Sequence, residues 1–321
     1  MNYTEMVIML GNKCTAACDI CCINASMECN ENIKLNELKN FILSSEKDKN
    51  IKLINFSGGE AFLYYNSLIE LVKCCKDINK KSTVITNGYW AKDYTSTLIK
   101  LSKLKEAGLN TIGVSYDQYH KKFIPIDNIK NISKVVKALD MKFSIQSVLV
   151  NEQNDFSWID DLGENLSDVH LNFIGCDPVG RAKERIQDAL YIRNECIHNK
   201  ICRKSATFCV SYTGDIYPCC SPYIFDSILA VGNIKENINV DEALKRLENN
   251  SILKLLRNKG FDFFVNIVDK HNICELPSKV ISACELCNII LNKNILKKMM
   301  PYILDELEKD SNCVRKTVMK S

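Results

Sequence analysis

Short apolar segments alternate with longer amphipathic segments through about residue 185, and this alternation constrains the fold more than any other feature. The short segments have the length of strands, whereas the longer ones carry apolar residues at helical spacing. Strand–helix units in series fold as a parallel sheet with helices outside it. The predicted strands are 6–10, 51–56, 82–85, 111–114, 143–149 and 169–174, and the predicted helices are 33–45, 67–77, 94–106, 126–139 and 155–166.

Six units are too few to close an eight-stranded barrel, so the α/β pattern predicts an open, TIM-like (β/α)6 barrel with functional residues at the carboxyl ends of its strands. After Glu184 the alternation stops. A hairpin is predicted within 206–219, around Gly214, with one or two helices at 240–257 and a C-terminal helix at 289–308. We therefore expect a barrel at 1–185, a small second domain at 186–295 and a C-terminal helix and tail at 296–321.

The chain is rich in cysteine, with 17 among 321 residues. Its first residues lack the basic segment of a signal peptide, and no apolar run is long enough to span a membrane. We expect a cytoplasmic protein whose thiols bind metal or act in catalysis. The net charge is +3, with Lys and Arg interspersed among Asp and Glu, so we expect neither nucleic acid nor membrane as a partner.

Cys14, Cys18 and Cys21 follow the first predicted strand with the spacing C-x3-C-x2-C. Three thiolates leave one iron of a cubane cluster open to chelation by a small molecule's amino and carboxylate groups. A zinc site usually pairs two C-x2-C units, and a ferredoxin cluster needs a fourth thiolate, for which Cys22 is the neighbouring candidate. Gly58-Gly59-Glu60 follows the second strand and offers close backbone approach and a carboxylate for an ammonium group.

Together the two motifs resemble the radical S-adenosylmethionine (SAM) superfamily. The resemblance implies a partial barrel, a [4Fe–4S] cluster on the three cysteines, and SAM bound at the open iron. The positions that match the family's SAM contacts are Ile20, Gly58, Gly59, Glu60, Asn87, Ser115, Asp117 and Arg181. Ile20 stands where the family often has an aromatic residue near the adenine.

Three of these positions have alternative interpretations. Ser115 and Asp117 match a segment that reaches the ribose, but both residue types also stabilise helix caps and turns. Arg181 could contact the SAM carboxylate or the substrate, or form a surface ion pair. His120, which follows this segment, is interpreted as polar surface.

A second set of cysteines resembles the twitch form of the SPASM/twitch extension. The matching positions are Cys202, Gly214, Cys219, Cys284 and Cys287. The resemblance implies an auxiliary [4Fe–4S] cluster on the four cysteines, with Cys209 and Cys274 as alternative ligands for one position each. A full SPASM domain would need further cysteines, and after Cys287 only Cys313 remains.

Cys220 directly follows Cys219, and a thiol is a good hydrogen-atom donor to a carbon radical. This arrangement resembles the radical SAM peptide epimerases of the epipeptide type. The resemblance implies that a SAM-derived radical abstracts the Cα hydrogen of one residue in a ribosomally made precursor peptide. Cys220 would then return a hydrogen to the opposite face, giving a D-residue, with flavodoxin or ferredoxin as reductant. The alternative role for Cys220 is that of a buried structural cysteine.

Other functions stay open from the sequence alone. One is a different peptide modification, a thioether or carbon–carbon cross-link, and another is a small-molecule dehydrogenase of the twitch type. An iron–sulfur electron carrier would explain the cysteines but not Gly58-Gly59-Glu60 or Arg181. The peptide, the modified residue and the oligomeric state cannot be identified from the sequence.

Overall fold

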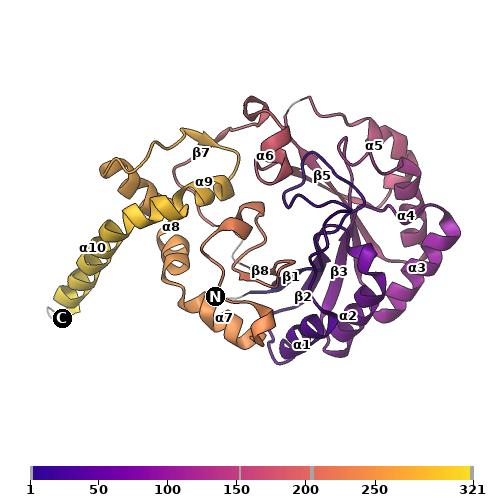
Figure 1. The fold of residues 1–321 in the computed structure, drawn as a ribbon, viewed down its shortest axis with the longest axis horizontal. Coiled ribbons are helices and arrows are strands. Elements are labelled where there is room, and N and C mark those ends of the chain that lie inside the picture. The colour runs from indigo at the N-terminus through magenta and orange to yellow at the C-terminus, as the bar shows by residue number, and fades with distance from the viewer. Residues whose placement is uncertain (1–2, 152, 203–205, 319–321) are drawn as a thin grey trace. The chain divides into compact units, whose positions relative to one another are not determined.

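The computed structural model describes residues 3–151, 153–202 and 206–318 (Figure 1). The chain divides into two compact units. The first unit comprises Met1–Ile192, Lys204–Phe225 and Leu229–Asn250, and the second comprises Arg193–Arg203, Asp226–Ile228 and Ser251–Ser321.

The first unit is built on an eight-stranded sheet with the order β6-β5-β4-β3-β2-β1-β8-β9. Its first six strands are parallel, as predicted: β1 (Glu5–Met9), β2 (Leu53–Ser57), β3 (Lys81–Thr86), β4 (Thr111–Ser115), β5 (Lys142–Leu149) and β6 (His170–Gly175). The predicted hairpin is also present, as β8 (Thr207–Val210) and β9 (Ile216–Tyr217). Because β8 pairs in parallel with β1, the hairpin extends the main sheet.

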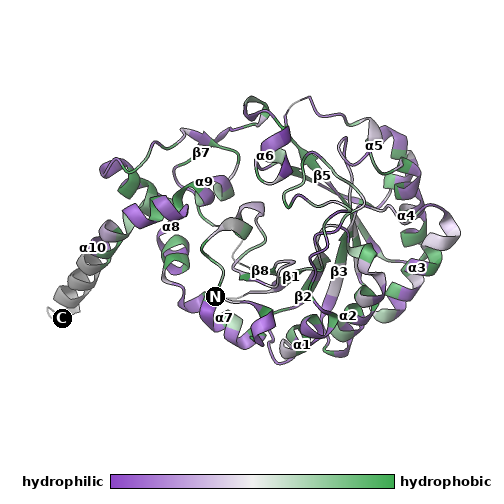
Figure 2. Cartoon of the chain, viewed as in Figure 1, coloured by the Kyte–Doolittle hydropathy of each residue, from purple (hydrophilic) through white to green (hydrophobic). Residues whose placement is uncertain are grey.

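Helices cover the outer side of this sheet (Figure 1). They are α1 (Leu35–Ser44), α2 (Tyr65–Asp77), α3 (Tyr94–Ala107), α4 (Ile126–Ala138) and α5 (Ser157–Leu162). The short α6 (Arg181–Arg185) follows β6, and its first amide donates to the carbonyl of Cys21. Figure 2 shows hydrophobic and hydrophilic residues alternating around these helices, as expected for helices with one covered face. Helix α5 ends earlier than predicted, because Gly163 has a φ of 50° and a 3₁₀ turn, η2 (Gly163–Leu166), follows it.

The core follows the strand period of two. In β2, Ile54 and Phe56 have no exposed surface, whereas the residues that alternate with them are partly exposed: Leu53, Asn55 and Ser57. Ile112 and Val114 of β4 are equally buried. Strand β6 is the edge of the sheet and carries mostly exposed side chains.

Helix α7 (Val240–Asn249) completes the first unit, and the second unit is mainly helical. Its helices are α8 (Ser251–Lys270), α9 (Ala283–Ile290) and α10 (Lys293–Val318), and it also holds the antiparallel pair β7 (Glu195–Cys196) and β10 (Lys279–Val280). Two helices, α7 and α8, lie where one or two were predicted at 240–257, but α8 extends to Lys270. The prediction of one helix over 289–308 was wrong, since α9 ends at Ile290 and α10 begins at Lys293. Asn250 ends α7, Gly260 kinks α8 with a φ of 72°, and Ser282 caps α9. Among the described residues, no helix is long and apolar enough to cross a bilayer.

The compact units do not coincide with the predicted parts 1–185, 186–295 and 296–321. The difference arises because β8, β9 and α7 belong to the first unit. A compact unit is not by itself a cluster-binding domain. The division into a barrel, a cluster-binding domain and a tail therefore stays a prediction.

Gly180 generates a test of the fold, because it lies where the segment after β6 touches the loop after β1. Its φ is 55°, and a Cβ atom there would lie 2.6 Å from the carbonyl oxygens of Cys21 and Cys22. We expect Gly180→Ala to destabilise the protein by about 2–4 kcal/mol, combining left-handed strain with overpacking. Thermal denaturation measures this loss. The matched control is Gly163→Ala, where φ is 50° but a Cβ meets nothing within 4 Å. Equal losses from the two variants would contradict the predicted contact.

Candidate functional site

The three cysteines of the first motif lie in an irregular loop, residues 11–32, between β1 and α1; we call it the cysteine loop. Backbone bonds join its two arms, from the amide of Asn12 to the carbonyl of Glu31 and from Cys14 to Ser26, both at 3.0 Å. The amide of Cys21 donates to the carbonyl of Cys18 at 3.1 Å. The loop therefore has a defined shape without regular secondary structure.

Amide groups are directed at the cysteine sulfurs. The backbone N–H of Ala16 donates to Cys14 Sγ at 3.4 Å, and that of Ala25 donates to Cys21 Sγ at 3.3 Å. Asn87 Nδ2 also donates to Cys14 Sγ, at 3.6 Å. Hydrogen bonds to the sulfurs are among the protein's means of controlling an iron–sulfur cluster, so this donor set fits one.

Cys14 is buried, and without a bound metal its surroundings disfavour the thiolate. Burial raises the pKa of the Cys14 thiol to about 12, with nearby Glu60 adding to the effect. Cluster irons would supply the positive charge that favours the thiolate. Among the described residues, no His, Cys, Asp or Glu side chains form a group of three that could hold one metal ion. A cubane cluster does not require three side chains to meet at one ion, because each cysteine binds its own iron.

The Gly-Gly turn after β2 is pressed against the cysteine loop. The amide of Gly59 donates to the carbonyl of Gly11 at 2.8 Å, and that of Glu60 donates to Lys13 at 2.9 Å. A Cβ on Gly59 would lie 2.4 Å from the Lys13 carbonyl oxygen, and one on Gly58 would lie 2.5 Å from that of Gly11. Glycine is therefore required at both positions by the close approach of the two backbones.

Glu60 is 1% exposed and fixed by three hydrogen bonds. Its Oε1 accepts from Thr86 Oγ1 at 2.6 Å and from the amide of Phe62 at 2.9 Å, and its Oε2 accepts from the amide of Asn87 at 2.7 Å. Burial raises the pKa of Glu60 to about 6, against the opposing effect of these bonds. The carboxylate is thus held rigidly near Cys14, and a cationic group would favour its charged form.

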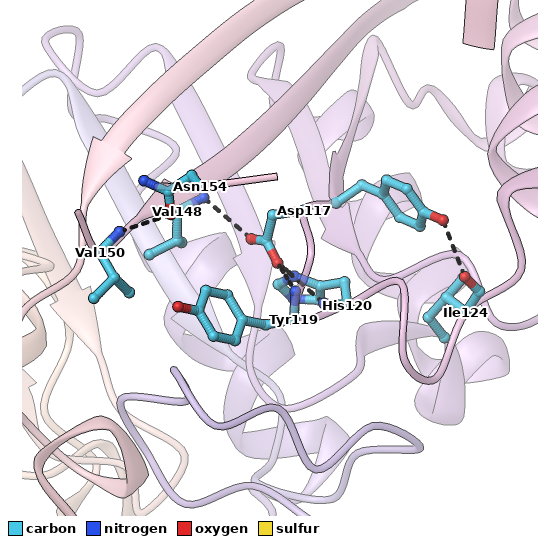
Figure 3. A network of polar contacts seen from close by, with 8 residues as sticks. Asp117, Tyr119, His120, Ile124, Val148, Val150 and Asn154 are labelled. Atoms are coloured by element: carbon cyan, nitrogen blue, oxygen red, sulfur yellow. Dashed lines mark hydrogen bonds and ion pairs between the residues drawn. The ribbon is translucent and has the colours of Figure 1, made fainter. Parts of the chain in front are cut away.

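Asp117 and His120 form a second polar centre, after β4 (Figure 3). His120 Nδ1 lies 2.9 Å from Asp117 Oδ1, and their side chains are 14% and 3% exposed. Burial opposes the charged forms of both groups. Their mutual attraction outweighs it, holding the pKa of His120 well above and that of Asp117 below the ordinary value. The interpretation of His120 as polar surface was therefore wrong, because its side chain is 14% exposed and pairs with Asp117.

The Asp117 carboxylate also accepts backbone hydrogen bonds. Its Oδ1 accepts from the amides of Tyr119 and His120, at 2.9 and 3.0 Å, and its Oδ2 from Val148, at 3.1 Å. The turn-stabilising role weighed for Asp117 is thus confirmed. Ribose contact by Asp117, or by half-buried Ser115 at the end of β4, stays a prediction.

Arg181 holds the cysteine loop. Its Nη1 donates to the carbonyl of Cys18 at 2.9 Å and its Nη2 to that of Ala25 at 2.8 Å, while its amide donates to Cys21 at 2.8 Å. These contacts differ from a surface ion pair. A contact with the SAM carboxylate, like that of buried Ile20 with the adenine, stays a prediction.

The remaining candidate cysteines are divided between the units. In the first unit, burial and the nearby thiols of Cys220, Cys219 and Cys22 raise the pKa of Cys209 well above its usual value. Cys202, Cys284 and Cys287 belong to the second unit, with the last two one turn apart on α9. An auxiliary cluster on Cys219 and these three, and the alternative ligand Cys274, stay predictions.

Sequence reasoning missed two contributors to the site. Thr86 bonds Glu60 and also accepts from Trp90 Nε1 at 3.0 Å. His120 stands three residues after Asp117, a spacing that allows the two side chains to meet, and this was the available signal.

Comparison with known proteins agrees with this geometry. Residues 8–162 match the radical SAM superfamily. YydG of Bacillus subtilis (strain 168), named for peptide biosynthesis, is 28% identical over 303 residues, covering 90% of this chain and 93% of its own.

Two solved structures share the fold. SuiB of Streptococcus suis bound to SAM superposes with a TM-score of 0.57 and 15% identity, covering 80% of this chain and 68% of SuiB. The anSMEcpe structure with bound SAM and a Cp18Cys peptide has a TM-score of 0.53 and 16% identity, covering 97% and 99% of the two chains. The two solved structures show the fold, and the family match identifies residues 8–162 as a radical SAM domain.

Proposed function

We propose that this protein is a radical SAM enzyme that converts one residue of a ribosomally made peptide from the L to the D form. The observation that carries the proposal is the position of Cys220. Buried Cys209 has both Cys220 and Cys22 as electrostatic neighbours, and Cys22 directly follows the proposed cluster ligand Cys21. Cys220, whose thiol could donate a hydrogen atom, therefore shares the neighbour Cys209 with Cys22 of the cysteine loop.

The relatives support a peptide as the substrate. YydG is named for peptide biosynthesis and aligns along nearly all of this chain. The anSMEcpe structure contains a bound peptide, and it spans 97% of this chain. The proposed partners are accordingly a precursor peptide and a reductant such as flavodoxin or ferredoxin.

Each residue of the site would have a separate role. Cys14, Cys18 and Cys21 would hold a [4Fe–4S] cluster, and Glu60 would hold the ammonium group of SAM. When bound, the cluster and SAM supply a carbon radical able to abstract a hydrogen atom. Arg181 and the Gly-Gly turn keep the cysteine loop in place.

Cys220 would complete the reaction. Its S–H bond breaks as a new Cα–H bond forms on the opposite face of the substrate radical, which leaves a sulfur radical on Cys220. One electron and one proton restore the thiol. The proposed source of the electron is the reductant. Cys202, Cys219, Cys284 and Cys287 would hold an auxiliary [4Fe–4S] cluster, which would be structural or would supply one-electron chemistry.

The proposed ligand sets predict the iron content. The reconstituted wild type should hold about eight irons as two clusters. Replacing Cys14, Cys18 and Cys21 together with Ala should leave about half of the iron and abolish SAM cleavage. The double change Cys284→Ala and Cys287→Ala should remove the other half and destabilise the second unit, because metal binding and local folding are coupled. A triple variant that retains all its iron would contradict the first ligand set.

Glu60 should control the affinity for SAM. Glu60→Gln keeps the shape of the side chain but removes the charge that would pair with the ammonium. The loss should be about 1.5–3 kcal/mol, or roughly ten- to a hundredfold in Kd, with iron content unchanged. Isothermal titration under anaerobic conditions measures it. Glu28→Gln, which changes an exposed carboxylate on the same loop, is the control. An unchanged Kd in Glu60→Gln would place this carboxylate outside the SAM site.

Cys220→Ala separates hydrogen abstraction from hydrogen return. The variant should still form 5′-deoxyadenosine, while formation of the D-residue should fall at least a hundredfold because the donor is missing. In deuterated water the wild-type product should carry one deuterium, since a thiol exchanges with solvent. Cys74→Ala, in a buried cysteine on α2, should behave as wild type. Normal D-residue formation by Cys220→Ala would reject the donor role, and a wild-type product lighter by two hydrogens would favour cross-linking.

A further inference from the structure

The two edges of the main sheet differ in how they are covered. At one edge, the β9 residue Ile216 bonds a neighbouring segment: its amide donates to the carbonyl of Gly232 at 2.8 Å, and its carbonyl accepts from the amide of Val231 at 2.9 Å. At the other edge, β6 has β5 on one side only. Within the ranges that the structure describes, no hydrogen bond from another segment reaches the outer side of β6. The backbone amides and carbonyls along that side are therefore open to a further strand.

Strand β6 lacks the features that usually protect an exposed edge. Such edges commonly carry a Lys, a Pro or an inward-pointing charge, or they are bulged or very short. The six residues of β6, His-Leu-Asn-Phe-Ile-Gly, include no Lys, Arg, Asp, Glu or Pro. Two large apolar side chains are instead exposed, Phe173 at 42% and Ile174 at 37%. The edge is therefore suited to pairing with a strand rather than protected from it.

The exposed apolar side chains lie on both faces of the sheet. Phe173 packs edge-to-face against exposed Phe156, with the ring centroids 5.9 Å apart. Phe156 directly precedes α5, so this aromatic pair lies on the helix-covered side of the sheet. Ile174 is the next residue of the strand and points to the opposite, inner side. A strand added along β6 would place its alternate side chains beside the aromatic pair on one face and beside Ile174 on the other.

These features specify the chemistry of the occupant. An extended polypeptide presents amides and carbonyls at the spacing of an edge strand, and strand addition is a recurring mode of peptide recognition. Because β6 has no acidic or basic residue besides His170, the segment that binds should carry apolar side chains. A second copy of this chain is a less suitable occupant, since six residues are few beside the about 20–30 residues a side of a stable interface.

The carboxyl end of β6 leads directly to the cysteine loop. Residues 176–180 join the strand to Arg181, whose amide donates to the carbonyl of Cys21 at 2.8 Å. The chain from Gly175 to Arg181 spans at most about 20–22 Å. A peptide held along β6 therefore has one end within that distance of the loop that carries the proposed cluster ligands.

We propose that the outer edge of β6 binds an extended, apolar segment of the precursor peptide as a further strand of the sheet, and so brings the adjoining peptide residues to the cysteine loop. The inference rests on the proposed function for the identity of the peptide. It adds a docking surface that is separate from the SAM contacts and from Cys220.

The first test changes the peptide and leaves the protein intact. The probe is the short peptide encoded beside this protein's gene, synthesised with a fluorescent label, and its Kd for the full-length protein is measured by anisotropy. Each backbone amide of the peptide is methylated in turn. Over the bound segment, every second methylation should weaken binding about tenfold, because alternate amides donate to the edge, and the intervening ones should have little effect. A scan without this period of two would overturn the proposal.

The second test changes the edge. Phe173→Lys introduces the charge that protected edges carry and should raise the Kd of the same peptide at least about tenfold. The matched control is Ile99→Lys, which alters a 53% exposed apolar residue of α3 and should leave the Kd at the wild-type value. Melting temperatures show whether both variants fold. An unchanged Kd in folded Phe173→Lys would overturn the proposal, and the methylation scan decides if this variant does not fold.

The outcomes separate this inference from the proposed function. A peptide that shows the period of two but gains no D-residue would support the edge and reject epimerisation. A D-residue formed in a peptide without that period would reject the edge and leave epimerisation standing. A wild type that does not bind the peptide would overturn both. Sedimentation tests the other occupant: a dimer that Phe173→Lys dissociates, with unchanged peptide affinity, would assign the edge to a second copy and overturn the proposal.

Discussion

The site depends on one backbone contact, that between the Gly-Gly turn after β2 and the cysteine loop after β1. Parallel pairing of the two strands, with Met9 opposite Ser57, brings both loops to the same edge of the sheet. The amides of Gly59 and Glu60 then bond carbonyls of the cysteine loop, with no room for a Cβ on Gly59. This contact joins the two motifs into one site, since it puts the Glu60 carboxylate near Cys14.

The other strand ends supply the remaining supports of the cysteine loop. Asn87 follows β3 and donates to Cys14 Sγ, and Arg181 follows β6 and donates to the carbonyls of Cys18 and Ala25. The loop has little regular structure, so its shape depends on the whole barrel. Each buried polar group in this set has a hydrogen-bond partner, which offsets the cost of removing it from water.

The thiols of the first unit extend from the cysteine loop to the β8–β9 hairpin. The electrostatic neighbours of Cys209 on β8 are Cys22 of the cysteine loop and, after β9, Cys219 and Cys220. The grouping depends on the parallel pairing of β8 with β1, which adds the hairpin to the sheet next to the strand that leads into the cysteine loop. The same strand pairing therefore links the proposed cluster ligands to the proposed hydrogen donor.

The sequence by itself determined the parallel sheet, the order of its six strands and the two motifs, because strand periodicity and the spacing of Cys14, Cys18 and Cys21 are local properties. Helix ends were less well predicted. At Gly163 and Gly260, the positive φ of a single residue ends or kinks the helix. Only the tertiary structure decided what the polar residues at the strand ends contact. The sequence left Arg181 as a contact of the SAM carboxylate or the substrate, or as a surface ion pair, and the structure shows it bonded to carbonyls of the cysteine loop. His120 was expected at the surface and pairs with Asp117. The partners of Arg181 lie 163 and 156 residues away in the chain, so no local pattern could identify them.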